Sequence, residues 1–512
     1  MRRGEPKLTR GANRSPSCKG TCIIGYGVAA AFVLAMLYLM VSTQFSFSSS
    51  PKDSESIHAT TRQRSHPGQE DEKREMEEEV AVVHTEPSTG RHRGNERYSD
   101  DWEERQQRQE KEKDTVKFSE FGGGTDDFNN VANKKLICDT SFGKYDVCEL
   151  EGDARAQGGA GATVTVVSPR AAPREWKIKP YSRKYLDGLK AVTVRSVPNA
   201  EDAPPCTTRL NIPAMVIELG GLTGNYWHDF TDVLVPLFIG ARRFSGEVQL
   251  LVVNLLPFWV DKYRKIFSQL SRHEIIDLEK DHGVVRCYPH VVVGYGSRKE
   301  FTIDPSLDDT GGGYTMVNFT EFLRHSYSLP RDRPIKLNHH QGSRPRMMIL
   351  ERTNSRKFMN LPEVVAAAEA AGFEVSVAGR PKASYDEFVR EVNSFDVMLG
   401  VHGAGLTNCL FLPTGAVLVQ IVPYGRLESI ARTDFGEPAR DMGLRYIEYA
   451  VAAEESSLTD VFGKDHPIIK DPISVHMSGW GNVAEWYLGK QDVRINIDRF
   501  RPVLMQVLEH LH

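Results

Sequence analysis

The stretch PRMMILE at residues 345–351 is the first of four apolar runs that decide the fold of the C-terminal part of this chain. The other three are EVSVAG (374–379), DVMLGV (396–401) and AVLVQIVP (416–423). Two segments between them, LPEVVAAAEAAGF and SYDEFVREVNSF, carry apolar residues at helical spacing. Short apolar strands that alternate with helices predict a parallel sheet covered on both faces. We therefore expect a Rossmann-like domain at residues 336–512. Its last segment, RFRPVLMQVLEHL, is expected to form a helix that packs back across a domain boundary.

A second alternation of the same kind lies upstream. The apolar runs AMVIEL (214–219), VQLLVV (248–253) and HVVVG (290–294) are separated by the helical patterns NYWHDFTDVLVPLFIGARRF and WVDKYRKIFSQLS. This pattern predicts another α/β domain with a largely parallel sheet, at residues 135–335. The predicted fold class is therefore α/β, with two Rossmann-like domains facing each other across a cleft.

The N-terminus carries a topological signal. Residues 23–41 read IIGYGVAAAFVLAMLYLMV, an uncharged run long enough to cross a bilayer as one helix. Six basic residues and one acid precede it, which predicts a cytosolic tail at 1–22 and a lumenal location for everything after residue 41. A cleaved signal peptide is the rival interpretation, although its apolar region is usually shorter. Residues 42–134 are rich in Ser, Glu, Arg and Lys, and we expect a disordered stem there.

The composition limits the class of binding partner, and the cysteine positions suggest which cysteines form disulfides. The formal net charge of -4, from 64 basic and 68 acidic residues, gives no general attraction to nucleic acid. In a lumenal domain Cys138 and Cys148 are candidates for a short disulfide, and Cys206 and Cys287 are a second candidate pair, although sequence leaves the connectivity open. Neither a C-x-x-C nor an Asp-x-Asp pair occurs, so no metal ion is expected. Asn318 begins an Asn-Phe-Thr sequon and is a candidate glycosylation site.

Two segments at predicted strand ends could hold an anionic ligand. The first, VHGAGLTNCLFLP, follows the third strand of the C-terminal domain, and its small residues let backbone N–H groups approach a phosphate. The second, ERTNSRKFMN, follows the first strand and places Arg352 and Arg356 four residues apart, where they could grip a diphosphate. A tight structural turn and a solvated basic turn are the alternatives. The candidate donor-binding residues are Arg352, Arg356, His402, Gly403, Ala404, Gly405 and Asn408.

A third motif lies in the N-terminal domain. GGLTGNYWHDFTDVLVPLF (220–238) opens a helix with an unusual density of polar and titratable residues. His228 and Asp229 are the candidate catalytic residues, because a His–Asp neighbourhood could supply the base that deprotonates an acceptor hydroxyl. The alternative is an ordinary capped helix with acids near its positive end. Adjacent residues point in different directions on a helix, so these two need not cooperate.

Together these blocks resemble the plant members of glycosyltransferase family 61, the group of xylan arabinosyl- and xylosyltransferases. The resemblance covers residues 137–511 and includes CDTSFGKYDVCELEGDARA, GGLTGNYWHDFTDVLVPLF, ERTNSRKFMN and HGAGLTNCLFLPTGAVLVQIVPYG. It implies the GT-B arrangement, a metal-independent inverting mechanism, a UDP-pentose donor and a xylan acceptor. It also implies residence as a single-pass type II protein of the Golgi membrane, where complexes with other glycosyltransferases are conceivable partners. Transfer to a glycoprotein, as N-glycan xylose or protein O-linked N-acetylglucosamine, and a non-catalytic partner subunit remain alternatives.

Overall fold

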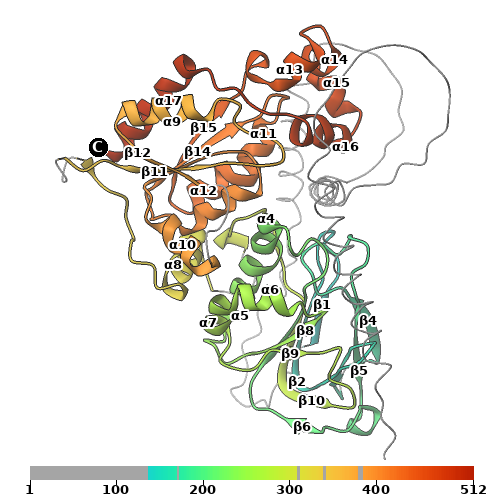
Figure 1. Cartoon of the computed structure of the whole chain (residues 1–512). Coiled ribbons are helices and arrows are strands. Elements are labelled where there is room, and N and C mark those ends of the chain that lie inside the picture. The colour runs from blue at the N-terminus through green and yellow to red at the C-terminus, as the bar shows by residue number, and fades with distance from the viewer. Residues whose placement is uncertain (1–135, 170–171, 308–311, 338–341, 379–383) are drawn as a thin grey trace, which may run out of the picture. The chain divides into compact units, whose positions relative to one another are not determined.

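The computed structural model describes residues 136–169, 172–307, 312–337, 342–378 and 384–512 (Figure 1). The predicted cytosolic tail, membrane-spanning run and stem, at residues 1–134, lie outside these ranges. Across the described ranges, every helix is too short or too polar to span a bilayer.

The C-terminal part contains a five-stranded sheet in which every pairing is parallel. The strand order is β12-β11-β13-β14-β15. Four of these strands coincide with the predicted apolar runs, and β15 is additional. Their bounds are β11 Arg346–Leu350, β12 Glu374–Ala378, β13 Val397–Val401, β14 Val417–Val422 and β15 Arg445–Ala450.

Successive residues of each strand point to opposite faces of the sheet, so both faces of this apolar sheet need to be covered. Helices pack against each face. Met347 and Ile349 pack in one cluster with α9 (Leu361–Ala371) and α17 (Ile497–Leu511), which lie together in Figure 1. Met348 and Leu350 join the opposite cluster, which includes residues of α10 (Tyr385–Asn393) and α12 (Glu437–Asp441). The glycine loop after β13 leads into a 3-10 helix, η5, at Ala404–Phe411.

The last helix does not pack across a domain boundary as expected. The apolar face of α17 includes Phe500, Leu504 and Val507, which lie in one cluster with α9 and the C-terminal sheet. Helical spacing shows that one face must be buried, but the sheet that receives it is decided by the tertiary structure. The remaining elements of this part are α11 Glu428–Ala431, η6 Arg432–Gly436, η7 Ala453–Glu455, α13 Ser457–Phe462, α14 Pro467–Lys470, α15 Pro472–Met477, α16 Trp480–Val483 and η8 Ala484–Gly489.

The N-terminal part contains a ten-stranded mixed sheet with the main order β4-β5-β3-β2-β10-β7-β8-β9. Its four last strands pair in parallel, as the alternation at 214–294 predicts. Strands from residues 136–197 extend it with mainly antiparallel pairs, so the whole sheet is less parallel than expected. The strands are β1 Leu136–Asp139, β2 Val147–Gln157, β3 Thr163–Val167, β4 Arg174–Ile178, β5 Val192–Val197, β6 Thr208–Arg209, β7 Ala214–Glu218, β8 Gln249–Val253, β9 Ile276–Asp277 and β10 Val285–Val293.

Helices between the two sheets form one continuous core. Met215 and Leu250, from one face of the N-terminal sheet, belong to the same cluster as Met348 and Leu418 from the C-terminal sheet. The two α/β parts are therefore joined by packed side chains. The helical elements of the N-terminal part are η1 Ala200–Asp202, α4 Tyr226–His228, η2 Asp229–Leu234, α5 Val235–Arg242, α6 Pro257–Lys262, α7 Arg264–Leu270, η3 Pro305–Leu307 and α8 Met316–Ser326.

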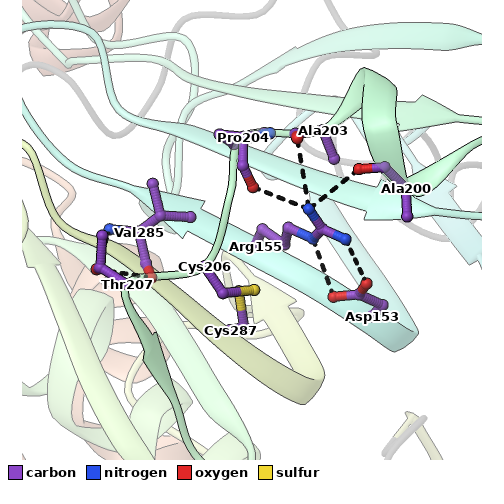
Figure 2. Close-up of a disulfide and its surroundings, with 9 residues drawn as sticks. All are labelled: Asp153, Arg155, Ala200, Ala203, Pro204, Cys206, Thr207, Val285 and Cys287. Atoms are coloured by element: carbon purple, nitrogen blue, oxygen red, sulfur yellow. Dashed lines mark hydrogen bonds and ion pairs between the residues drawn. A yellow bond between two sulfur atoms is a disulfide. The ribbon is translucent and has the colours of Figure 1, made fainter.

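Both candidate cysteine pairs are disulfides in the structure. Cys138 joins Cys148 across the β1–β2 pair, and Cys206 joins Cys287 of β10. Figure 2 shows Arg155 beside the second bond, where its guanidinium donates to carbonyl oxygens of Ala200, Ala203 and Pro204. The segment before Cys206 is thus held by a covalent bond and by a buried arginine. Cys409 is a buried free thiol, as expected, and burial raises its pKa to about 12.

Candidate active site

The candidate donor segments meet at the switch point of the C-terminal sheet. Numbered along the chain, the strand order is 2-1-3-4-5, and the first and third strands, β11 and β13, are neighbours. The connections leave these two strands in opposite directions, which opens a crevice at their carboxyl ends, where α/β sheets bind ligands. Arg352 follows β11 and His402 follows β13.

Gly403 lets the two arginines approach the loop closely. A methyl group at its Cα would lie 2.4 Å from Nη1 of Arg352 and 3.1 Å from Nη1 of Arg356. The backbone of Gly403 has a φ of 143°, a conformation that a side chain would strain. The structure therefore brings together three of the predicted donor-binding residues.

Arg352 and Arg356 have different surroundings. Arg356 is almost buried, has a positive φ of 57° and donates from Nη1 to the carbonyl oxygen of His402 at 3.0 Å. A non-glycine residue in the left-handed region marks a backbone held by its surroundings, often at a functional site. Arg352 donates from Nε to the Ser355 carbonyl at 2.9 Å and lines the cavity described next. Arg356 thus supports the loop, while Arg352 faces the ligand space.

A cavity of about 370 Å³ opens beside these residues. Three of the predicted donor residues, Arg352, Gly405 and Asn408, line it. Its walls come from both α/β parts. They are formed by Tyr226, Lys262, Leu350, Glu351, Arg352, Thr353, Asn354, Ala378, Tyr385, Phe388, Val401, Gly405, Leu406 and Asn408. Arg356, His402, Gly403 and Ala404 lie in the adjoining turns instead of in the walls.

His402 is neutral in this site. It is 2% exposed, and burial together with Arg356 and Arg352 lowers its pKa to about 3. The Gln420 amide accepts from the Tyr446 hydroxyl through Oε1 and donates from Nε2 to Nδ1 of His402 at 2.8 Å. The proton of the neutral ring is therefore on Nε2, which points toward the Asp434 carboxylate at 3.8 Å.

Asn408 joins the two parts of the chain. Its Oδ1 accepts from the Tyr226 hydroxyl at 2.9 Å, and its Nδ2 donates to the Gly405 carbonyl at 2.8 Å. The Tyr226 hydroxyl also lies 3.0 Å from the Tyr385 hydroxyl. These contacts fix one wall of the cavity.

His228 is supported by Asp232, one helical turn later. Its Nδ1 lies 3.0 Å from Oδ2 of Asp232, which also receives both a hydrogen bond from Tyr181 and an ion pair with Arg183. Burial disfavours the charged form of Asp232, but Arg183 and His228 outweigh burial and hold its pKa well below the usual range. A carboxylate only accepts, so Nδ1 of His228 carries a proton and donates to Asp232. The ring is 1% exposed and does not line the cavity.

Asp229 lies in a buried hydrogen-bond network, and its predicted catalytic role stays a prediction. It is fully buried, and its carboxylate accepts from the Gly224 N–H, the Trp259 indole N–H and the Tyr263 hydroxyl, each at 2.7 Å. A carboxylate saturated by three donors holds the loop and two helices in place. Sequence reasoning placed Asp229 at the site because it adjoins His228, but a side chain adjacent on a helix faces another direction.

Comparison with known proteins now identifies the family. The glycosyltransferase 61 family model matches residues 226–419, from α4 through β14, and therefore includes both His228 and the donor turns. An alpha-1,3-arabinosyltransferase of Oryza sativa subsp. japonica, XAT2, is 44% identical over 391 residues, which cover 75% of this chain and 66% of the relative. A rice beta-1,2-xylosyltransferase, XYXT1, is 42% identical over 402 residues, 74% of this chain and 85% of the relative. The chain belongs to the glycosyltransferase 61 family.

A more distant family 61 relative comes from another plant. The xylan glycosyltransferase MUCI21 of Arabidopsis thaliana is 34% identical over 397 residues, covering 73% of this chain and 79% of the relative. Because this chain spans just under two thirds of the rice arabinosyltransferase, part of that relative has no counterpart in the alignment. The chain is a glycosyltransferase, and its resemblance to the xylan group of family 61 is shown by these identities.

Three residues of this family 61 site were not singled out as site residues from sequence. Asp232 could have been found, because four residues separate it from His228 on a predicted helix. Lys262 and Tyr385 line the cavity from α6 and α10, which are far apart in sequence. No local pattern links those two residues to the donor turns.

The glycosylation candidate Asn318 lies on α8, away from the residues that line the 370 Å³ cavity. Its Oδ1 accepts from the Thr315 N–H at 3.0 Å and caps the helix, and the residue is exposed. A sugar attached to Nδ2 would leave that capping bond in place. Its modification in this family 61 enzyme stays a prediction.

Proposed function

We propose that this glycosyltransferase transfers a pentose, arabinofuranose or xylose, from a UDP-sugar to the backbone of xylan. The rice and Arabidopsis relatives, named as arabinosyl-, xylosyl- and xylan transferases, support this choice. The observation that carries it is the cavity at the β11–β13 switch point, lined by Arg352 on one side and by Tyr226 and Lys262 on the other. This layout supports the GT-B arrangement, with donor bound by the C-terminal part and acceptor by the N-terminal part.

The donor diphosphate would bind beside Arg352 and the Gly403–Gly405 turn. The guanidinium offers two parallel donors to phosphate oxygens, and the small residues expose backbone N–H groups. Glu351, also in the cavity wall, can accept hydrogen bonds from sugar hydroxyls. Neutral His402 contributes a hydrogen-bond donor and helps to fix the conformation of the loop. The positive charge that balances the diphosphate comes from other residues.

His228 is the proposed general base. The ring is 1% exposed and lies outside the cavity walls, so this role requires acceptor binding to open access to Nε2. With Nδ1–H held by Asp232, Nε2 would then take the proton of an acceptor hydroxyl as that oxygen attacks the anomeric carbon of the donor. The bond between that carbon and the diphosphate breaks on the opposite face, which inverts the configuration. UDP leaves with the bonding electrons, and His228 carries the acceptor proton.

The proposed mechanism uses no metal ion. Two clusters among the described residues have metal-binding residue types, Asp153 with Cys206 and Cys287, and Glu149 with Glu151 and His290. Neither cluster contributes to the walls of the 370 Å³ cavity, and the first contains a disulfide. The leaving diphosphate would then be stabilised by side-chain cations and backbone dipoles.

An exposed phenylalanine is the best placed acceptor platform. Trp227 and Trp259 are both buried and donate their indole N–H groups to the Asp434 carbonyl oxygen and the Asp229 carboxylate. Phe258 is 70% exposed and lies one helical turn before Lys262 on α6. Residues four apart share one helix face, so Phe258 lies on the same face of α6 as Lys262, although outside the cavity walls. We assign it to an acceptor xylose ring.

The cellular setting follows from the N-terminal sequence. We propose a single-pass type II protein of the Golgi membrane, anchored by residues 23–41, with the catalytic part in the lumen. Complexes with other glycosyltransferases acting on the same polysaccharide are compatible with this setting.

One assay tests the proposed function. The full-length chain, purified in detergent, is incubated with a xylo-oligosaccharide and either UDP-arabinofuranose or UDP-xylose, and the product's mass and linkage are determined. We expect addition of one pentose, unchanged by a chelator. No pentose transfer, together with transfer of N-acetylglucosamine to a protein acceptor, would instead establish the glycoprotein-directed alternative.

A further inference from the structure

Lys262 presents an ammonium group to the donor cavity from the acceptor side. It is the last residue of α6, its side chain is 33% exposed, and it lines the cavity opposite Arg352. The other charged residue among the lining residues is Glu351. The N-terminal part therefore contributes the cation of Lys262 to the cavity. The C-terminal part contributes the other basic residue, Arg352.

Aromatic rings hold Lys262 at this position. Its Nζ lies 4.8 Å from the ring centroid of Tyr226, 4.7 Å from that of Tyr263 and 5.4 Å from that of Tyr385. These distances are within the range of cation–π attraction. The Tyr226 and Tyr263 hydroxyls are themselves bonded to Asn408 and Asp229, so the rings are fixed before any ligand arrives.

The carboxylate nearest to Lys262, that of Asp229, is already hydrogen-bonded to other donors. Nζ lies 3.4 Å from Oδ2 of Asp229, whereas three other donors reach this carboxylate at 2.7 Å. Burial lowers the pKa of Lys262, and Asp229 opposes that shift. An ammonium group with only a long contact to an already satisfied acid can turn to a new anion at little cost.

The donor site needs a second cation. A UDP-sugar carries two negative charges on its diphosphate, and more charge develops on it as the sugar departs. His402 is neutral and Arg356 is directed to a backbone carbonyl, so Arg352 is the one predicted donor-binding cation that lines the cavity. Charge stabilisation of the leaving group is usually a large part of catalysis in such sites.

We propose that Lys262 binds the donor diphosphate opposite Arg352, so that the anion bridges the two α/β parts. The inference rests on the proposed function, because it takes the ligand to be a nucleoside diphosphate sugar. On donor binding the Lys262 ammonium exchanges its long contact with Asp229 for a phosphate oxygen. The acceptor side of the enzyme is thereby coupled to the presence of the donor.

Binding measurements on the full chain test this role. UDP affinity is measured by calorimetry, and uridine affinity by competition, for the parent, Lys262→Gln, Lys262→Arg and Arg352→Gln. A lost charge-assisted bond predicts about tenfold weaker UDP binding for Lys262→Gln, with uridine unchanged. Lys262→Arg should retain UDP affinity within roughly threefold, since it keeps the charge.

Lys265→Gln is the matched control. Lys265 also lies over a tyrosine ring, that of Tyr327 at 5.5 Å, and pairs with Asp386 at 2.8 Å, but it does not line the cavity. Its variant should bind UDP like the parent. Parental UDP affinity in Lys262→Gln, or equal loss of UDP and uridine, would overturn the role of Lys262. Failure of the parent itself to bind UDP would overturn the proposed function instead.

Discussion

Two histidines at the ends of parallel strands illustrate how the two α/β parts differ. His402 follows β13 in the C-terminal part, and His228 lies on α4, which comes shortly after β7 in the N-terminal part. Each is preceded or followed by glycines, and each is nearly buried. Their neighbours differ, because His402 adjoins two arginines and accepts from a glutamine, with the Asp434 carboxylate only at 3.8 Å, whereas His228 donates to a carboxylate at 3.0 Å.

The same residue type therefore has two chemical roles. Beside arginines, the His402 ring stays neutral and serves as a fixed hydrogen-bonding element of the donor turn. Beside Asp232, the His228 ring is oriented by its Nδ1 proton, and the imidazolium formed on proton transfer is stabilised. In the proposed function, the C-terminal part binds the anionic donor and the N-terminal part receives the acceptor proton.

The largest expected effect concerns proton transfer by His228. His228→Gln should lower turnover by roughly 10²–10⁴-fold, the usual contribution of a general base. UDP affinity should stay within about twofold, because the donor turns belong to the other sheet. Steady-state kinetics and calorimetry on the same preparation measure both quantities. Turnover equal to that of the parent would place the base elsewhere.

Asp229 provides the contrast to Asp232 on the same helical segment. Asp229→Asn replaces Oδ2 by an amide nitrogen that cannot accept from the Tyr263 hydroxyl, while the remaining oxygen can still accept from Gly224 and Trp259. The substitution should lower the free energy of unfolding by about 1–3 kcal/mol. Urea unfolding measures this loss. Turnover per folded molecule should remain far above that of His228→Gln. Normal stability with abolished turnover would restore Asp229 as the base.

His402 should make stability depend on pH. The unfolded chain binds a proton at this ring near pH 6.5, whereas the folded chain does not until about pH 3. Stability from His402 is therefore complete above pH 6.5 and is lost as the pH falls, by about 2 kcal/mol at pH 5. Urea midpoints at pH 7.5 and pH 5 should diverge less in His402→Gln than in the parent.

A control separates this effect from general acid sensitivity. His282 is exposed, so His282→Gln should show the same pH dependence as the parent. If the His402→Gln variant and the parent lose the same amount of stability between the two pH values, the assignment of His402 as neutral is wrong.

The smallest expected effect lies on the acceptor side, at Phe258. Removing a stacking ring worth roughly 1 kcal/mol should raise the KM for xylo-oligosaccharide by about fivefold in Phe258→Leu, with the KM for UDP-sugar unchanged. Phe258→Trp should retain the acceptor KM, since it keeps a flat apolar face. An unchanged acceptor KM in Phe258→Leu would remove this residue from the acceptor site.

Sequence alone predicted much of the C-terminal part and less of the N-terminal part. The apolar runs of β11 to β14 are short, continuous and separated by helical patterns, so local periodicity was enough. In the N-terminal part, residues 136–197 add antiparallel strands with no such alternation, and their place in the sheet depends on long-range pairing with β10. The packing of α17 on the C-terminal sheet was not predicted for a similar reason, because it depends on contacts distant along the chain.

The sequence by itself determined that a glycine turn and two arginines follow neighbouring strands, because strand ends and turn residues are local features. It also placed a histidine beside acids on one helix. Only the tertiary structure decided that His402 is neutral and that Asp232 rather than Asp229 supports His228. It also decided that Lys262 lies beside tyrosines of α4, of α10 and of the junction between α6 and α7. Charge state and orientation depend on partners distant along the chain, such as Gln420 for His402 and Arg183 for Asp232, which only folding brings into contact.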